Sequence, residues 1–412
     1  MMSTTNRHFD VIVIGAGILG CASADYLSAQ GQKVLLLDRR APASATTSQA
    51  AALLGRARGD ATGLDMVDET WRAIERLQTN LKEDLDVRAC GSLHAGVSAA
   101  ASAKIHALAD ETTKRHRAAR YLDTHDLQAR LPWLQAPRDA VAVFVAEDGY
   151  IDPYQLASAY LRHARRCGAR LQLNAEVAEI LTGSQGVCGV RCADGVSYYS
   201  RQIVVTGGPW SALLLRPLGL APAMAPVRSQ YWISAPDAHI QADTPVLVLP
   251  DANAYARPEV GGLLFGLRDR QRVNCSPEQL PEDIHRFSFD QDSDGLASLE
   301  DGYESLQRWL PMLDELRVAA YVSGVSSYTP DGRFLIGALE IPGLWLASGC
   351  CGGGVGASGG YGRLIAELVS GVRPFTNASL YDPNRFDAHD VNPFDPAFRL
   401  RCALAREGKV SG

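Results

Sequence analysis

Apolar runs and amphipathic stretches alternate along this chain, and their lengths predict a mixed α/β protein. Residues 11–14 and 34–37 are wholly apolar, which is typical of parallel strands buried on both faces. The small residues between these two runs predict a helix. Residues 64–85 repeat apolar side chains at helical spacing. Asp152 and Pro153 are the residue types of an N-cap and a first helical position, so another helix is expected after them.

The rest of the chain predicts further strands and one closing helix. Short alternating runs between about 225 and 320 favour an antiparallel sheet with one face toward solvent or a ligand. Residues 358–371 predict a helix that Gly371 closes, with Pro374 just beyond it. The runs of strand length are 169–173, 177–181, 201–206, 230–234 and 263–267.

The glycines after the first apolar run carry the clearest chemical signal. Gly15, Gly17 and Gly20 form a G-x-G-x-x-G pattern between a predicted strand and a predicted helix, and Asp38 ends the next strand. In a dinucleotide site the first glycine permits a tight turn, the second lets a pyrophosphate approach the backbone, and the third allows close packing. The acidic residue at the end of the second strand, here Asp38, binds a ribose hydroxyl in such a site. This segment therefore predicts a dinucleotide site.

Composition narrows the class of protein. The chain has 412 residues, of which 46% are hydrophobic and 21% are charged, and its formal net charge is −6. These values favour a globular protein and argue against nucleic acid as a partner. The first apolar run is too short to cross a bilayer and is interrupted by glycine, so no transmembrane segment is predicted. We expect a cytoplasmic enzyme.

Nine cysteines are scattered along the chain without a secretion signal, which favours reduced thiols. No C-x-x-C pair and no histidine pair at ligand spacing occurs, so no metal is predicted. The adjacent Cys350 and Cys351 are either redox-active or, as we favour, small residues that fill a glycine-rich loop.

Five stretches together resemble the FAD-dependent D-amino acid oxidase superfamily, which includes glycine oxidase, sarcosine oxidase and dimethylglycine dehydrogenase. The resemblance extends from residue 9 to about Phe386. The five stretches are the fingerprint through Asp38, the loop 45–51, Glu176-Val177, the turn 206–211, and the segment from Thr329 to Gly356.

The resemblance implies a Rossmann-like FAD-binding domain interleaved with an antiparallel-sheet α+β substrate domain, as in the glutathione reductase type of FAD fold. It assigns residues 1–88, 146–222 and 324–390 to the FAD-binding domain, 89–145 and 223–323 to the substrate domain, and 391–412 to a C-terminal tail.

The resemblance also implies the residues that hold FAD. We expect the FAD to be non-covalent, because the cysteine that some relatives attach to flavin falls at Gly324 and no histidine occupies the other attachment region. The expected FAD-binding residues are Gly15, Ala16, Gly17, Ile18, Leu19, Gly20, Asp38, Arg39, Arg40, Thr47, Ser48, Val177, Thr206, Gly207, Trp210, Gly352, Gly353, Gly354, Val355 and Gly356.

The substrate end departs from the family pattern. The arginine that usually binds a carboxylate before Thr-Pro-Asp corresponds to Ser326, and the lysine of sarcosine oxidases corresponds to Gly356. The substrate is therefore no simple free amino acid, or another cation holds its carboxylate. The candidate cations are Arg56, Arg58, Arg228 and Arg257; Tyr231, Trp232 and Tyr255 form either an aromatic wall or part of the core.

Family chemistry implies hydride transfer from the carbon that bears the amine to flavin N5, giving an imine that hydrolyses. The lysine that activates oxygen in monomeric sarcosine oxidase corresponds to Leu264, which favours a dehydrogenase over an oxidase. The substrate is an amino acid or secondary amine, and the electron acceptor is a quinone, an electron-transfer protein or oxygen. No catalytic residue is assigned; His94 faces the site or caps a strand.

Two alternatives remain open at this point. One is a D-amino acid or sarcosine-type oxidase that forms hydrogen peroxide. The other is the flavin-bearing subunit of a hetero-oligomeric amine or opine dehydrogenase, with a partner subunit or further copies of the chain. The polar tail from Phe398 to Gly412 has no evident place in the core, so it either docks such a partner or is disordered.

Overall fold

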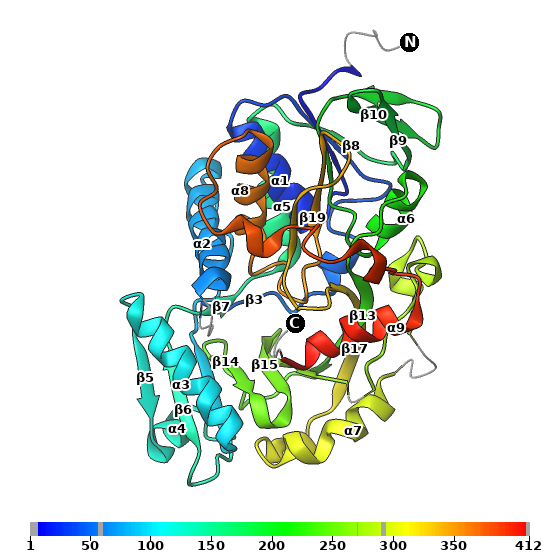
Figure 1. Ribbon diagram of the computed structural model, residues 1–412. Coiled ribbons are helices and arrows are strands. Elements are labelled where there is room, and N and C mark those ends of the chain that lie inside the picture. Colours follow the sequence, from blue (N-terminus) through cyan, green and yellow to red (C-terminus); the bar gives the residue numbers. More distant parts are fainter. Residues whose placement is uncertain (1–6, 57–60, 270, 290–293, 409–412) are drawn as a thin grey trace.

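The computed structural model describes residues 7–56, 61–269, 271–289 and 294–408. Two large sheets dominate it, one in the upper and one in the lower half of Figure 1. The upper sheet has six strands, and all neighbours are parallel except β18 and β19. Its order is β18 (Leu335–Ala338), β19 (Leu344–Ser348), β12 (Ile203–Val205), β1 (Val11–Ile14), β2 (Val34–Leu37) and β8 (Arg170–Gln172).

The central strands of this sheet are buried on both faces, as their unbroken apolar runs predict. Val11 and Val13 of β1 belong to the core on the helical side, whereas Ile12 and Ile14 belong to the core on the opposite side. Successive side chains of a strand point to opposite faces. A strand covered on both faces must therefore be apolar at every position.

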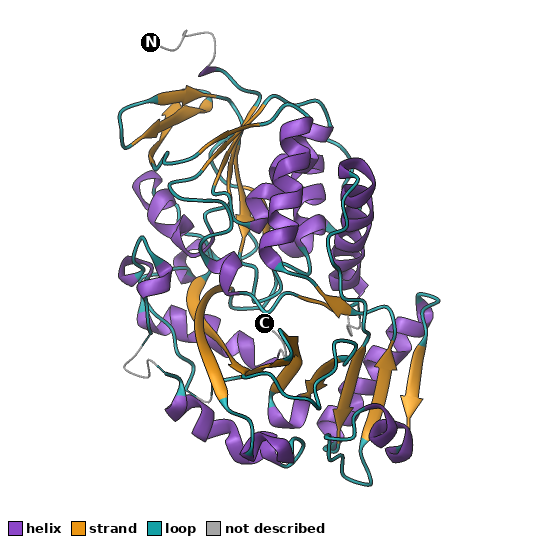
Figure 2. Ribbon diagram, turned by 180° about the vertical axis from the view of Figure 1, so that it is seen from behind, coloured by secondary structure: helices purple, strands orange, loops and turns teal. Residues whose placement is uncertain are grey.

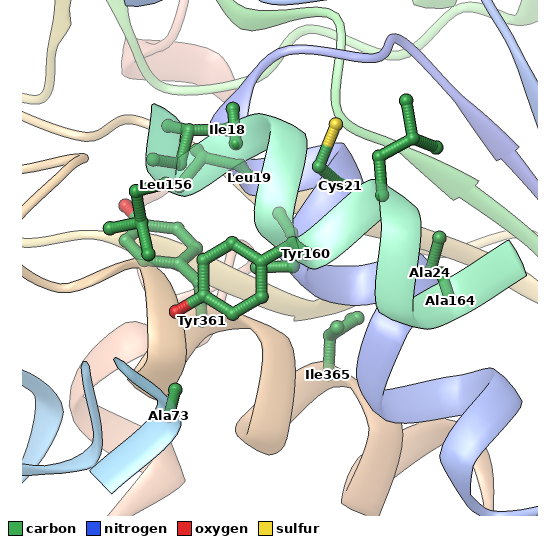
Figure 3. Close-up of a cluster of buried hydrophobic side chains, with 14 of the residues drawn as sticks. Ile18, Leu19, Cys21, Ala24, Ala73, Leu156, Tyr160, Ala164, Tyr361 and Ile365 are labelled. Atoms are coloured by element: carbon green, nitrogen blue, oxygen red, sulfur yellow. The ribbon is translucent and has the colours of Figure 1, made fainter. Parts of the chain in front are cut away.

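Four helices pack together on one face of this sheet: α1 (Ile18–Ala29), α2 (Ala61–Leu81), α5 (Pro153–Arg166) and α8 (Ser358–Val369). Figure 3 shows their core, in which Tyr160 and Leu156 of α5 lie near Tyr361 and Ile365 of α8. The predicted cap of α5 is confirmed, since the Asp152 side chain accepts a hydrogen bond from the Gln155 N–H at 2.7 Å.

The other face of the six-stranded sheet is covered by a small antiparallel sheet of β9 (Val177–Gly183), β10 (Gly186–Cys192) and β11 (Ser197–Tyr199). Ile180, Val187 and Val190 share a buried cluster with the sheet residues on that side. Short α6 (Ser211–Leu215) follows the turn after β12.

The lower sheet is antiparallel apart from the parallel pair β14 and β4, which agrees with the prediction for the middle of the chain. Helices α3 (Ala99–Lys114), α4 (Thr124–Arg130) and α7 (Leu296–Gln307) accompany it (Figures 1 and 2). The strands of the lower sheet follow the order β17 (Val318–Tyr328), β13 (Ala225–Ser234), β16 (Gly262–Leu267), β15 (Ala254–Glu259), β14 (Val246–Leu249), β4 (Ser92–Gly96), β6 (Val141–Val145) and β5 (Ala119–Leu122).

The two halves are joined by several crossings of the chain. The pair β3 (Leu53–Leu54) and β7 (Gly149–Tyr150) lies between them. Strand β17 continues through the predicted domain boundary at residue 324 as one strand. The exact boundaries of the two domains stay a prediction.

The C-terminal segment has a place in the core, so the expectation of a docking or disordered tail is wrong for α9 (Pro396–Leu404). This helix lies beside β13 and β17 (Figure 1). Its Phe398, Cys402 and Ala403 are buried against Ala225 and Val227 of β13. The apolar face of α9 is therefore used within the chain itself.

The structure also bears on membrane-spanning helices and on the state of the cysteines. None of the helices in the described part of the chain is long and apolar enough to span a membrane. All nine cysteines are free thiols in the structure.

Candidate active site

A cavity of about 840 Å³ lies between the two large sheets and is lined by both. On one side, its lining begins at the carboxyl ends of parallel strands β1, β2 and β12, at Gly15, Asp38 and Thr206. Ligands of parallel α/β sheets bind at such strand ends. On the other side, Tyr231 of β13 and Tyr255 of β15 line it. Its volume is within the range of about 300–1,000 Å³ that is usual for small-molecule sites.

The glycine turn after β1 has the geometry that its sequence predicts. Gly15 has φ +106°, a backbone conformation that favours glycine. A Cβ on Gly20 would lie 1.7 Å from the Gly15 carbonyl oxygen, so only glycine allows the helix to pack this close. A Cβ on Gly17 would meet only Thr47 Oγ1, at 3.4 Å, and would otherwise point into open space. The turn therefore leaves a backbone surface exposed beside the cavity.

Two side chains hold this turn in place. The Ile18 N–H at the start of α1 donates to Thr47 Oγ1 at 3.0 Å. Asp38 accepts from the backbone N–H groups of Ala16 at 2.6 Å and Arg40 at 2.7 Å. Burial raises the pKa of the Asp38 carboxyl, while these N–H donors act against that rise. Each carboxylate oxygen keeps a further lone pair, so Asp38 can still accept a ribose hydroxyl.

Three buried polar side-chain atoms at the cavity have no hydrogen-bond partner among the described residues, which is expected of a site for a polar ligand. Thr46 Oγ1, Trp210 Nε1 and Ser211 Oγ are buried and make no hydrogen bond with any residue that the structure describes. All three residues line the cavity. Since buried polar groups are normally paired, an elongated ligand with several hydrogen-bonding groups fits this wall. The residues present therefore fit FAD.

Most of the expected FAD-binding residues line this cavity. Ala16, Gly20 and Ser48 do not; Ala16 binds Asp38 through its N–H, and Gly20 packs on the turn. The residues that line it are Gly15, Gly17, Ile18, Leu19, Asp38, Arg39, Arg40, Thr47, Val177, Thr206, Gly207, Trp210, Gly352, Gly353, Gly354, Val355 and Gly356.

The glycine-rich loop before α8 closes one side of the cavity. Ser326 Oγ accepts a hydrogen bond from the Gly352 N–H at 3.0 Å and lies 3.4 Å from Cys350 Sγ. Ser326 and Cys350 both line the cavity. Ser326, at the position of the family's arginine, thus holds the loop. Cys351 has φ +47° and donates its N–H to the Ser327 carbonyl at 2.8 Å, so the pair of cysteines shapes a tight turn.

The substrate end of the cavity has an aromatic wall. Tyr231, Tyr255 and Leu264 form one buried cluster, and the two tyrosines line the cavity. The Tyr255 ring lies over Gly266, where a Cβ would come within 2.3 Å of the ring. Burial raises the pKa of Tyr231 to about 12 and that of Tyr255 further. Both hydroxyls are therefore protonated at neutral pH.

The candidate arginines of the substrate end are engaged elsewhere or lie outside the described residues. Arg257 does not line the cavity: it donates to the Ala51 carbonyl at 2.8 Å, pairs with Glu259, and stacks on the Tyr150 ring at 4.5 Å. Arg228 pairs with buried Asp269 at 2.6 Å. Arg58 lies outside the described residues.

Arg56 and Trp232 also have partners away from the cavity. The Arg56 guanidinium lies 3.0 Å from Glu147 and stacks on the Trp71 ring at 4.6 Å. Trp232 is fully buried and stacks on Phe265 at 5.8 Å, so it belongs to the core.

The structure adds a hydrogen-bonded chain of three cavity-lining residues that the sequence did not single out together. Ser92 Oγ donates to Asp148 Oδ2 at 2.6 Å, and the same oxygen lies 3.0 Å from His94 Nε2. Lys104 of α3 also lines the cavity. The alternation of Ser92 and His94 in strand β4 signals a shared face, but Asp148 comes from 56 residues away. Sequence alone therefore gives no sign of the three-residue chain.

Known proteins similar to this chain cover most of its length. It is 26% identical over 391 residues to dimethylglycine dehydrogenase, mitochondrial, of Homo sapiens. The aligned region covers 92% of this chain and 44% of that protein. It is 25% identical to monomeric sarcosine oxidase of Streptomyces avermitilis, over 92% of this chain and 98% of that protein. The chain thus spans about half the length of the first of these relatives.

A solved structure shows the same fold. L-proline dehydrogenase from P. horikoshii superposes with a TM-score of 0.81 at 19% identity, over 93% of this chain and 99% of that one. A model of the family described as DAO, FAD dependent oxidoreductase, matches residues 10–368. This chain belongs to the DAO family of FAD-dependent oxidoreductases.

Proposed function

We propose that this chain is an FAD-dependent dehydrogenase of amino acids with a secondary or tertiary amine, such as N-methylated or cyclic ones. The observation that carries the proposal is one cavity that joins a dinucleotide turn at Gly15 to an aromatic wall at Tyr231 and Tyr255. FAD supplies a hydride acceptor when it is bound. The printed names of the relatives, dimethylglycine dehydrogenase and sarcosine oxidase, support a methylated amine as the substrate.

The residues of the wall position and desolvate an amine. Tyr231 and Tyr255 are neutral at physiological pH, and their ring faces attract the partial positive charge of an N-methyl group. Removal of water favours the neutral amine, which is the form that can release a hydride from its neighbouring carbon. Leu264 shares a buried cluster with the two rings, which keeps their surroundings apolar.

A cation at the cavity can hold the carboxylate of an amino acid. Ser326 replaces the usual arginine, and Arg257 is paired with Glu259. Lys104 of α3 lines the cavity, and its side chain is exposed. We assign Lys104 to the substrate carboxylate, since a long side chain at the rim can reach an anion inside.

Two features support a dehydrogenase with non-covalent FAD. Leu264 stands where monomeric sarcosine oxidase has its oxygen-activating lysine. The Leu264 side chain carries no charge and is 1% exposed. Gly324, at the position of the attachment cysteine, has no side chain, and a Cβ there would already lie 3.3 Å from Gln49 Cβ.

The acceptor and the flavin linkage are tested together. Turnover of sarcosine, dimethylglycine and proline is measured with oxygen or a quinone as the sole acceptor, and the protein is precipitated with acid. We expect quinone-dependent turnover that exceeds oxygen consumption at least tenfold, and yellow FAD in the supernatant. Equal rates with oxygen and hydrogen peroxide release would make the protein an oxidase. Flavin that stays in the precipitate would contradict non-covalent binding.

A further inference from the structure

The three-residue chain Asp148–Ser92–His94 fixes the chemical form of a histidine at the cavity wall. Ser92 has one hydroxyl hydrogen, and it donates this hydrogen to Asp148 at 2.6 Å. The Ser92 oxygen can then only accept from the histidine, at 3.0 Å from Nε2. His94 therefore carries its hydrogen on Nε2, which leaves a lone pair on Nδ1.

The Nδ1 atom of His94 is open for a ligand. Nδ1 makes no hydrogen bond with any residue that the structure describes. The His94 residue keeps 8% of its surface exposed. His94 itself lines the cavity.

The register of the lower sheet places His94 close to the aromatic wall. His94 of β4 pairs with Val248 of β14, and Val248 pairs with Tyr255 of β15. Residues that pair across adjacent strands point to the same face. Adjacent strands lie about 4.8 Å apart, so the His94 and Tyr255 backbones are about 10 Å apart on one face. Val248 lies between them on this face and also lines the cavity, so an amine that lies over Val248 can face both side chains.

We propose that His94 Nδ1 accepts the N–H hydrogen of a neutral secondary amine substrate, and that Ser92 and Asp148 hold His94 in the tautomer that can do so. This assignment rests on the proposed function and adds to it the group that orients the amine. A lone pair fixed by a buried carboxylate selects an N–H donor, so His94 distinguishes secondary amines from tertiary amines, which have no N–H in their neutral form.

Two amide variants separate the two ring nitrogens. The side-chain oxygen of asparagine takes the place of Nδ1, whereas glutamine reaches the place of Nε2. H94N therefore keeps an acceptor toward the substrate, and H94Q keeps only the contact with Ser92. H106Q is the matched control, because His106 is exposed on α3 and bonds to Tyr121.

The kinetic test compares kcat/KM for sarcosine, a secondary amine, with that for dimethylglycine, a tertiary amine. We expect H94Q to lower the sarcosine value about tenfold more than the dimethylglycine value, as loss of one hydrogen bond predicts. H94N should restore most of the loss, and H106Q should change neither value. An equal loss for both amines, or no loss, would overturn the assignment. A wild-type protein that oxidises none of sarcosine, dimethylglycine and proline would instead refute the proposed function and, with it, the role of His94.

A second test needs no turnover. The ¹⁵N NMR spectrum of protein labelled at histidine reports which ring nitrogen carries hydrogen. We expect a neutral His94 with hydrogen on Nε2, and a shift toward the other tautomer in S92A. A wild-type His94 with hydrogen on Nδ1 would contradict the proposal, whether or not the variants fold.

Discussion

At the scale of single residues, the site depends on the missing side chain of Gly17 and on the low proton affinity of His94. Gly17 has no side chain, so the backbone of the turn stays open to the cavity. His94 cannot easily take up a proton, because burial lowers its pKa to about 4. Each property is local and can be changed by one substitution.

Gly17→Ala tests the open backbone. Gly17 has φ −67° and ψ 177°, which alanine adopts without strain, and the new methyl group meets only Thr47 at 3.4 Å. The variant should fold, yet its methyl group takes up the space that we propose for the pyrophosphate. We expect FAD affinity to fall at least tenfold, measured by fluorescence titration of the apoprotein. Gly183→Ala, with open space around it, is the control and should bind FAD normally. Equal affinity in the two variants would place the cofactor elsewhere.

The pH dependence of stability tests the burial of His94. The unfolded state takes up a proton near pH 6.5, whereas the folded state does so only near pH 4. The unfolded state thus binds more protons in this window, and the free energy of unfolding falls as the pH drops. From the two pKa values, the contribution lost by pH 4 is about 3 kcal/mol.

His94→Gln removes this contribution. Urea unfolding of the wild type and the variant between pH 4.5 and 7.5 should show a stability difference that shifts in favour of the variant as the pH falls. A constant difference over this range would show that His94 titrates normally in the folded protein.

At the scale of elements, a helix or strand can be predicted from sequence to the extent that its signal lies in its own residues. Strands β1 and β2 were predicted because both faces are covered, which makes every position apolar. Helix α9 was missed, since its buried residues are interleaved with arginines and its apolar face has meaning only against β13. An element whose stability comes from one distant partner gives little sign in its own residues.

Phe398→Ala tests whether α9 belongs to the folded core. The side chain is 2% exposed, so the truncation should lower the free energy of unfolding by about 3–5 kcal/mol. Leu400→Ala on the same helix removes a side chain that is 43% exposed and should change stability by about 0.5 kcal/mol or less. Urea denaturation measures both variants. Similar values for the two would mean that α9 does not pack as described.

At the scale of the whole molecule, the site is a product of topology. The glycine turn and Asp38 come from one short segment, so they could be predicted from spacing alone, whereas the other residues at this end were expected only from the resemblance. The substrate end combines strands from distant parts of the chain, and register decides which side chains reach it. Arg257 was a reasonable candidate by sequence, but the structure pairs it with Glu259 two residues away. His94 was a candidate by sequence, but its link to Asp148 through Ser92 became visible only in the folded chain.

The proposed function depends on one claim, that this cavity holds FAD and brings an amine to it. The most direct measurement is the visible spectrum of the purified protein under anaerobic conditions, before and after addition of sarcosine, dimethylglycine and proline. We expect an oxidised flavin band that at least one of these amines bleaches. A protein reconstituted with FAD that shows no flavin band, or a flavin band that none of the amines bleaches, would contradict it.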